Sequence, residues 1–182
     1  MAEGHDMAKE LATLGSTYHA LVKVKPESLD QTRHEVLQHF AKRGMPGVVI
    51  LFTIPYAEAK AHMEKLGLDI GRIFFIDCVT KGASLRRETN VAYFKDPARS
   101  ADISIALAQY VDAVEGDKWM MVDPINTLLG FMDEPLAVKF TNILTARASQ
   151  ISMQAIFLAI KDKDPGFMQD VSMFFDKVMD YG

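Results

Sequence analysis

The chain alternates short apolar runs with longer segments in which apolar residues recur every three or four positions. Residues 47–53 (GVVILFT) form the clearest short run: they have strand length and no polar alternation, which is typical of a strand buried on both faces of a parallel sheet. Further strands are predicted at residues 19–25, 72–77, 118–123 and 152–160. The pattern also allows a short strand at residues 91–94.

Helical spacing follows these runs. A helix is predicted to open at Pro26 and Glu27, others at residues 55–66 and 100–114, and another to open at Asp133 and Pro135. Strands that alternate with such helices specify right-handed βαβ units. We therefore predict an α/β fold with a three-layer, doubly wound, mainly parallel sheet in residues 19–182, preceded by an N-terminal tail or helix in residues 1–18.

Composition narrows the class of protein. The formal net charge of the 182-residue chain is −4, which argues against a broad basic surface for nucleic acid or an anionic membrane. No apolar run approaches the roughly 18 to 20 residues of a membrane helix. Cys78 is the single cysteine and can form no internal disulfide, which favours a reducing compartment. We expect a cytoplasmic protein that does not span a membrane.

In a doubly wound sheet, ligands collect where the strands end at their carboxyl ends. After the first strand the sequence reads KPESLDQT, without the glycine-rich loop or the GK[ST] motif that cradles phosphate groups. Glu27 and Asp30 lie instead in the first helical turn, where they suit the positive end of the helix dipole and would repel a phosphate. The pattern favours a plain crossover helix here.

Asp123 ends the apolar run WMMV, as the carboxylate of a Walker B strand does when it holds magnesium. Asp77 ends the run RIFFI in the same way. A strand-end aspartate is equally typical of a residue that caps the following turn, and that alternative stays open for both. With Thr53 after the second strand, these two residues are the candidate cofactor-binding residues.

The sequence lends less support to a metal site, a nucleophilic cysteine or a basic binding surface. The five histidines form neither an HExxH nor an HxH arrangement, so no metal site is expected from them. Cys78 follows Asp77 and is interpreted as a buried, inert thiol rather than a nucleophile. Lys81, Arg86 and Arg87 form a basic cluster that either contacts an acidic partner or is simply solvated.

Four stretches together resemble a known family. They are residues 47–77 (GVVILFTIPYAEAKAHMEKLGLDIGRIFFID), 93–97 (YFKDP), 118–131 (KWMMVDPINTLLGF), and the final region with SMQAIFLAI and FFDKVMDYG. On these residues the chain resembles the RecA-superfamily ATPases, in particular the KaiC-like and Rad55-like proteins, over roughly residues 19–182. Leu66-Gly67, Ile76-Asp77 and Asp123 followed by Asn126-Thr127 match the family's pattern. The resemblance implies a RecA-like, P-loop NTPase-like core.

The departures from that family decide the expected function. The resemblance places a P-loop between Lys25 and Thr32, where none is present, and a catalytic glutamate at Thr53 or Ile54, neither of which can act as a base. Of the family's usual P-loop, catalytic glutamate and Walker B aspartate, only the aspartate remains, as Asp123. We therefore expect a non-catalytic domain with a degenerate Walker A segment and no cofactor, which acts as a regulatory or protein-interaction scaffold, in signalling or through self-association.

Two alternatives from other classes stay open. The first is an atypical ATP-binding protein or ATPase in which Asp123 holds magnesium. The second is a small-molecule sensor or enzyme of another doubly wound family, which would need a polar, enclosed pocket near Thr53, Asp77 and Asp123.

Overall fold

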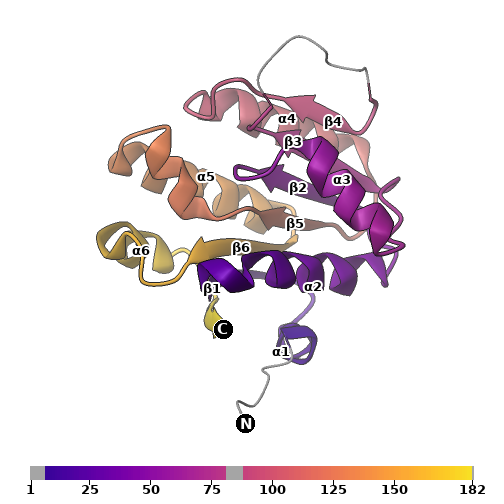
Figure 1. Cartoon of the computed structure of the whole chain (residues 1–182), viewed down its shortest axis with the longest axis horizontal. Helices are drawn as coiled ribbons and strands as arrows, with labels where there is room; N and C mark the ends of the chain where they lie inside the picture. Colours follow the sequence, from indigo (N-terminus) through magenta and orange to yellow (C-terminus); the bar gives the residue numbers. More distant parts are fainter. Residues whose placement is uncertain (1–6, 81–87, 182) are drawn as a thin grey trace.

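The structure, a computed structural model, describes residues 7–80 and 88–181. In this part of the chain seven strands form one sheet, and every pair of neighbouring strands is parallel (Figure 1). The strands are β1 (Tyr18–Val24), β2 (Gly47–Leu51), β3 (Ile73–Asp77), β4 (Val91–Tyr93), β5 (Trp119–Val122), β6 (Gln154–Ile160) and β7 (Lys177–Tyr181), in the spatial order β4-β3-β2-β5-β6-β1-β7.

Helices cover both faces of the sheet. They are α1 (Met7–Thr13), α2 (Leu29–Ala41), α3 (Tyr56–Lys65), α4 (Ser100–Ala113), α5 (Glu134–Gln150) and α6 (Pro165–Ser172), with short 3-10 helices η1 (Pro26–Ser28) and η2 (Ile125–Gly130). Because strand side chains alternate between faces, the sheet builds two cores. In β2, for example, Val49 and Leu51 pack with α1, α2 and α3, whereas Val48 and Ile50 pack with α4, α5 and α6. This three-layer arrangement confirms the predicted fold class.

The order of the strands explains why the helices divide between the faces. From β1 through β2 and β3 to β4 the chain moves toward one edge of the sheet, and from β4 through β5 and β6 to β7 it moves back. Right-handed crossovers that run in opposite directions place their helices on opposite faces. β2 and β5 are neighbours, and the connections that leave them run in opposite directions along the sheet. Doubly wound proteins bind ligands in the crevice at the carboxyl ends of such a pair of strands.

Two elements at the end of the chain were missed by the hydrophobic pattern. After β6, which we expected to be the last strand, the chain adds α6 and β7, and β7 pairs with β1 at the edge of the sheet. Only Met179 and Tyr181 of β7 are buried, since the strand has a neighbour on one side only. A five-residue strand with three polar or exposed positions gives too weak an apolar signal to detect.

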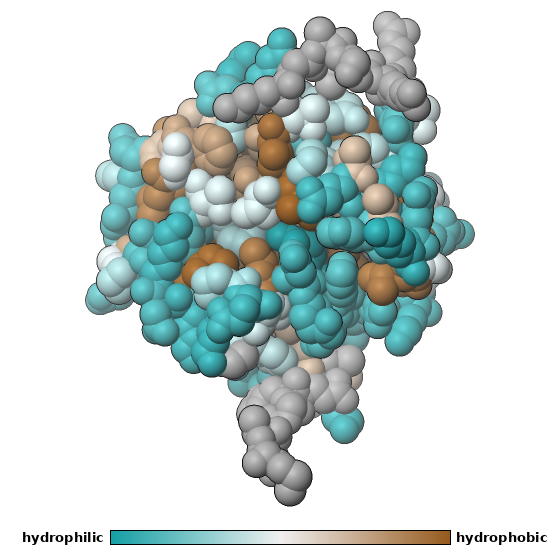
Figure 2. Space-filling model, viewed as in Figure 1, coloured by the Kyte–Doolittle hydropathy of each residue, from teal (hydrophilic) through white to brown (hydrophobic). Residues whose placement is uncertain are grey.

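The surface in the same view is mostly hydrophilic, with hydrophobic residues in separate spots (Figure 2). At the N-terminal end, α1 packs Met7 and Leu11 into the core beside α2, and both side chains are 1% exposed. The division of the chain near residue 18 stays a prediction. Among the described helices, none combines the length and apolar character needed to cross a bilayer.

Candidate functional site

The carboxylate of Asp123 lies at the carboxyl end of β5, beside the end of β2, and is completely buried. Its Oδ2 atom accepts hydrogen bonds from the backbone N–H groups of Phe52 (3.1 Å) and Thr53 (2.8 Å), and from the hydroxyl of Thr53. These donors follow β2 directly, because β2 and β5 are paired in register up to Ile50 and Val122. The structure therefore brings together two of the three sequence-predicted residues, Thr53 and Asp123.

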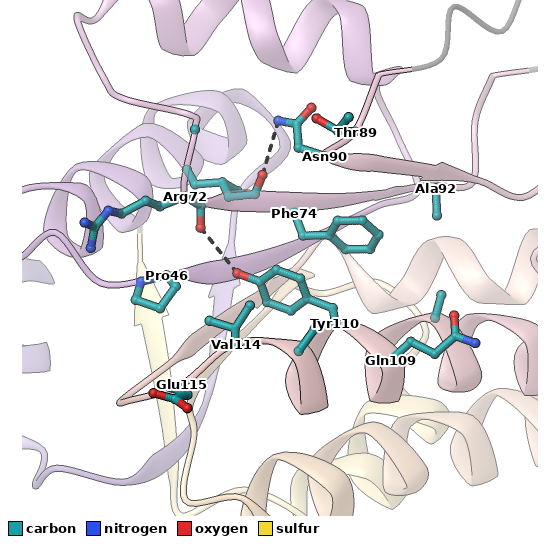
Figure 3. Close-up of a pocket in the computed structure, with 14 residues that line it drawn as sticks. Pro46, Arg72, Phe74, Thr89, Asn90, Ala92, Gln109, Tyr110, Val114 and Glu115 are labelled. Carbon is teal, nitrogen blue, oxygen red and sulfur yellow. Dashed lines mark hydrogen bonds between the residues drawn. The ribbon is translucent and has the colours of Figure 1, made fainter.

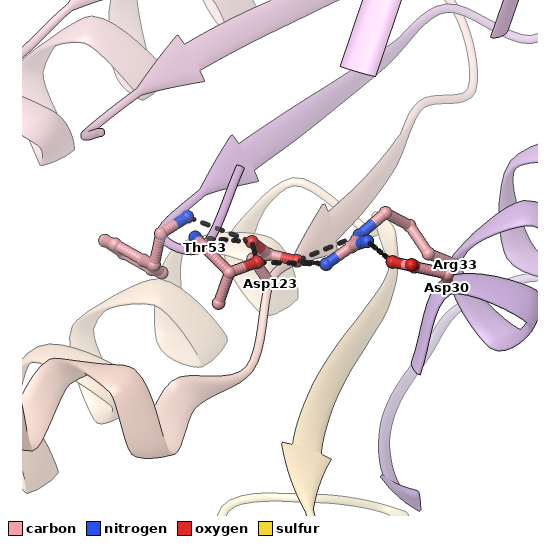
Figure 4. A network of polar contacts seen from close by, with 5 residues as sticks. Asp30, Arg33, Thr53 and Asp123 are labelled. Atoms are coloured by element: carbon pink, nitrogen blue, oxygen red, sulfur yellow. Dashed lines mark hydrogen bonds and ion pairs between the residues drawn. The ribbon is translucent and has the colours of Figure 1, made fainter. Parts of the chain in front are cut away.

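The other oxygen of this carboxylate is held by a residue that the sequence analysis did not select. Arg33, on α2, is 3% exposed and donates from Nε (3.1 Å) and Nη2 (2.8 Å) to Oδ1 of Asp123 (Figure 4). Its Nη2 also donates to the Thr53 hydroxyl at 3.0 Å, and its Nη1 pairs with Asp30. Asp30, Arg33, Thr53 and Asp123 thus form one polar network, which we call the Arg33–Asp123 network. Arg33 and Asp123 are buried at its centre, whereas Asp30 and Thr53 are exposed.

This network does not fit a magnesium ion on Asp123. A carboxylate offers about four lone-pair positions, and here two donors occupy Oδ1 and three occupy Oδ2. A divalent cation would have to displace Arg33, whose positive charge already neutralises the carboxylate and would repel the ion. No group of three or more His, Cys, Asp or Glu side chains with metal-binding geometry is found among residues 7–80 and 88–181.

Asp77 is also completely buried, but it belongs to a different network. Its Oδ2 accepts from the backbone N–H of Tyr56, the first residue of α3, at 2.8 Å, and from the Thr80 hydroxyl. Its Oδ1 accepts from the backbone N–H groups of Val79 (2.8 Å) and Thr80 (2.9 Å). Asp77 thereby caps the turn after β3 and anchors the start of α3, which is the structural role that strand-end aspartates commonly have.

The thiol of Cys78 lies next to this cap and is 3% exposed. Burial raises the pKa of the Cys78 thiol to about 12, and the negative charges of Asp77 and Asp123 add to the shift. A thiol with so high a pKa carries almost no thiolate at neutral pH and is a poor nucleophile. The basic cluster of Lys81, Arg86 and Arg87 lies outside the described residues.

The connection from β1 to α2 stands where a phosphate-binding loop would be needed. Here the chain forms the 3-10 turn η1, in which the N–H of Ser28 bonds the carbonyl of Lys25 at 3.0 Å. A phosphate loop instead directs successive free amides toward one point, usually with the help of glycine. In this turn Pro26 has no N–H to offer, and Glu27 adds a negative charge that would repel a phosphate.

A large pocket lies away from this network. It is an open pocket of about 730 Å³ beside β3 and the edge strand β4, covered on one side by α4 (Figure 3). Phe74 and Tyr110 stack in it with ring centroids 5.0 Å apart, and the Tyr110 hydroxyl donates to the carbonyl of Arg72 at 3.3 Å. Small side chains such as Ala92 and Ala106 leave the space open. This pocket could not be predicted from the sequence, because alanines and a stacked ring pair carry no recognisable chemistry.

The outer edge of β4 borders this pocket. Asn90, Ala92 and Phe94 direct their backbone groups toward β3: the N–H of Phe75 bonds Asn90 at 2.8 Å, and the N–H of Phe94 bonds Asp77 at 2.8 Å. Because these directions alternate along a strand, the backbone groups of Val91 and Tyr93 point outward. No described residue pairs with them. Within residues 7–80 and 88–181, this edge of the sheet therefore has no neighbouring strand.

The comparisons with known proteins bear on the fold alone. No protein-family model matches the chain, and no curated protein sequence matches it. Solved structures do match. A KaiC-like protein from the hyperthermophilic archaeon Pyrococcus horikoshii has a TM-score of 0.65 and 12% sequence identity, with 90% of this chain and 71% of that chain covered.

Two further P. horikoshii proteins are similar in structure. One is an uncharacterized protein solved in complex with an unknown peptide, with a TM-score of 0.69 and 12% identity over 98% of this chain and 82% of that one. The other has a TM-score of 0.64 and 10% identity over 96% of this chain and 87% of that one. Together with the parallel seven-stranded sheet, these matches show that the chain has a KaiC/RecA-like α/β fold.

Proposed function

We propose that this chain is a non-catalytic KaiC/RecA-like domain that works in the cytoplasm by binding another polypeptide and does not hydrolyse ATP. One observation carries the proposal: the Arg33–Asp123 network fills the acceptor positions of Asp123, the carboxylate that stands in the Walker B position of the resemblance. An ATPase needs that carboxylate to bind magnesium, directly or through water. Here it binds an arginine from the protein itself.

The neighbouring groups support the same conclusion. The β1–α2 turn has no cradle of free amides, and the position after β2 that would need a general base carries Thr53, whose hydroxyl is engaged by Asp123 and Arg33. Phosphate binding, charge neutralisation and water activation would all be weakened together. These electrostatic contributions are usually the largest in phosphoryl transfer.

Binding of a polypeptide is supported by the edge of β4 and its pocket. Outward-pointing backbone groups at Val91 and Tyr93 offer hydrogen bonds to an extended segment, and the pocket beside Ala92 offers space for an apolar side chain. The structural neighbour that was solved with an unknown peptide makes the same class of ligand reasonable for this fold. The extended segment can come from a different protein or from a second copy of this chain.

The first test is calorimetric titration of the protein with Mg-ATP and Mg-ADP, together with the Asp123→Asn variant. We expect no saturable heat with either nucleotide at millimolar concentration. Saturable binding that depends on magnesium and is lost in Asp123→Asn, while circular dichroism shows that the variant is folded, would overturn the proposal and favour a nucleotide-driven switch.

A second test addresses the edge of β4. Peptides selected from a displayed library on the wild-type protein should lose binding to Ala92→Glu, which places a charge in the pocket. They should retain binding to Ala101→Glu, a matched change at an exposed position of α4 that does not line the pocket. Equal binding to both variants would exclude this edge as the docking site.

A further inference from the structure

A second, smaller pocket lies at the amino ends of the strands. Asp123 lies at the other end of the sheet, where the strands have their carboxyl ends. The pocket has a volume of about 390 Å³ and is enclosed by α1, the turn after it, the first residues of β1 and β6, and the last turn of α2. Pockets that hold small molecules begin at roughly 300 Å³. The pocket is therefore large enough for a small organic molecule.

A fixed cation forms part of the wall. Arg43 is exposed and lies just after α2; it donates from Nη1 to Oε1 of Gln154 at 2.9 Å and contacts Nε2 of His39 at 3.4 Å. Gln154 is 3% exposed and is itself held through its Nε2, which donates to the carbonyl of Ser16 at 3.1 Å. Arginine has five N–H donors, so this arrangement orients the guanidinium while leaving other donors for a ligand.

No described acidic side chain lines the pocket or forms an ion pair with Arg43. His39 does not compete for an anion, because burial and the charge of Arg43 lower the pKa of its imidazole and favour the neutral ring. Within the described residues, the positive charge of Arg43 is thus available to the pocket.

A buried donor without a partner lines the same pocket. Tyr18 is 3% exposed, and its hydroxyl makes no hydrogen bond with any described residue. Buried polar groups almost always have a partner, so an orphan in a pocket wall leaves a hydrogen-bonding position that a water molecule or a ligand group can fill. Burial raises the pKa of the Tyr18 phenol to about 12, while Arg43 lowers it, so that the hydroxyl is protonated and can donate at neutral pH.

The remaining wall is apolar and comes from α1 and the residues that follow it. Leu11 is 1% exposed, and Leu14 is half-buried beside it. We propose that this pocket binds a small organic anion, whose carboxylate or phosphate group is held by Arg43 and the Tyr18 hydroxyl and whose short apolar part packs on Leu11 and Leu14. This site is independent of the β4 edge and of the Arg33–Asp123 network.

The test uses three small probes, followed by calorimetry and by amide chemical shifts. Butyrate carries a carboxylate and a short tail, methyl phosphate carries the other candidate head group, and butyramide is the neutral analogue of butyrate. We expect at least one of the two anions to bind with a dissociation constant on the order of a millimolar, and butyramide to bind about tenfold more weakly or not at all. The tighter of the two anions identifies the head group.

Variants separate recognition from folding. Arg43→Gln should weaken anion binding about tenfold or more, whereas Lys42→Gln, which removes an exposed charge one position away, should leave it unchanged. Tyr18→Phe should weaken binding severalfold without lowering the melting temperature of the free protein, because the hydroxyl it removes has no partner there. A structural role for the hydroxyl would lower that temperature instead.

Three outcomes would overturn the proposal. They are the absence of binding by both anions at ten times the expected dissociation constant, equal affinity for butyramide and the tighter of the two anions, and equal weakening by Arg43→Gln and Lys42→Gln. The last would show a nonspecific response to net charge.

Discussion

Replacing Arg33 by methionine tests whether the Arg33–Asp123 network is a structural element of the core. Methionine fills much of the volume of the arginine side chain but cannot donate a hydrogen bond. The change leaves Oδ1 of Asp123 buried without its two donors, which lie at 3.1 and 2.8 Å in the wild type. It also removes the charge that neutralises the carboxylate.

The expected loss in the free energy of unfolding depends on the hydrogen bonds that Asp123 keeps in the variant. Removing one partner of a buried ion pair typically destabilises a protein by about 3 to 5 kcal/mol. Here Oδ2 keeps two backbone N–H donors and the Thr53 hydroxyl, so we expect the lower end, about 3 kcal/mol, for Arg33→Met. For a chain of this size that corresponds to a drop of roughly 6 to 12 °C in melting temperature.

Urea unfolding followed by tryptophan fluorescence measures this loss. Trp119 is the single tryptophan, is completely buried, and stacks on Phe40 with ring centroids 4.8 Å apart, so its emission reports the state of the core. The control is Lys42→Met, which removes an exposed cation near the end of the same helix. If Arg33→Met loses no more stability than Lys42→Met, the network contributes nothing and the reasoning fails.

A double-mutant cycle isolates the pair itself. Asp123→Asn should also destabilise the protein, because it leaves Arg33 buried with only Asp30 as an ionised partner. The double variant removes both charges and should be more stable than the sum of the single losses by about 1 to 3 kcal/mol. Strictly additive losses would show that Arg33 and Asp123 are not coupled.

Three more measurements test other parts of the structure. A Cβ at position 47 would lie 2.0 Å from the Trp119 ring, so Gly47→Ala should lower stability by about 1 to 3 kcal/mol and disturb the Trp119 emission, whereas Gly15→Ala, which meets nothing within 4 Å, should not. Cys78 should react with Ellman's reagent at pH 8 only as fast as the protein opens, because burial raises the pKa of its thiol to about 12; rapid reaction in the native state would contradict its assigned position. The rings of His34 and His62 meet edge to face with centroids 5.7 Å apart. Burial is the main cause that lowers the pKa of His34 below 6.5, and the charge of His62 adds to it. Asp30 raises this pKa and Arg33 lowers it. The unfolded chain therefore takes up this proton first, so stability should fall as the pH drops below about 6.5, and urea titrations of His34→Gln should show a shallower fall; an unchanged slope would refute the assignment.

The sequence was sufficient for the centre of the sheet and for β4 at one edge, and insufficient for β7 at the other edge. Buried strands such as β2 and β5 are apolar throughout, since both faces and both neighbouring strands exclude water, and such runs are visible in one dimension. Edge strands have no such signature. β7 has two buried positions and β4 has none. The local pattern allowed a strand at residues 91–94, where β4 is found, but not β7, whose existence follows from its pairing with β1.

The same limit applies to the two hollows. The pocket beside β4 depends on how far α4 stands from the sheet, and the smaller pocket depends on where α1 packs against α2 and β1. These distances are set by packing between elements that are far apart in the sequence. Tyr18 and Arg43 belong to segments whose local patterns indicate only a strand and the end of a helix.

The role of Arg33 could have been predicted from the sequence. This residue follows Leu29 by four positions and precedes Val36 and Leu37 by three and four, which places it on the apolar stripe of its helix. A charge in such a stripe needs a buried partner, and Asp77 and Asp123 were the evident candidates. The choice between them depends on strand order: α2 connects β1 to β2, and because β6 and β5 lie between those strands, the helix must cross over them. The carboxylate at the end of β5 then lies beneath the first turns of α2, whereas the carboxylate at the end of β3 lies beyond β2 and beside α3. Topology therefore pairs Arg33 with Asp123, and the carboxylate that resembles a metal ligand becomes part of the core.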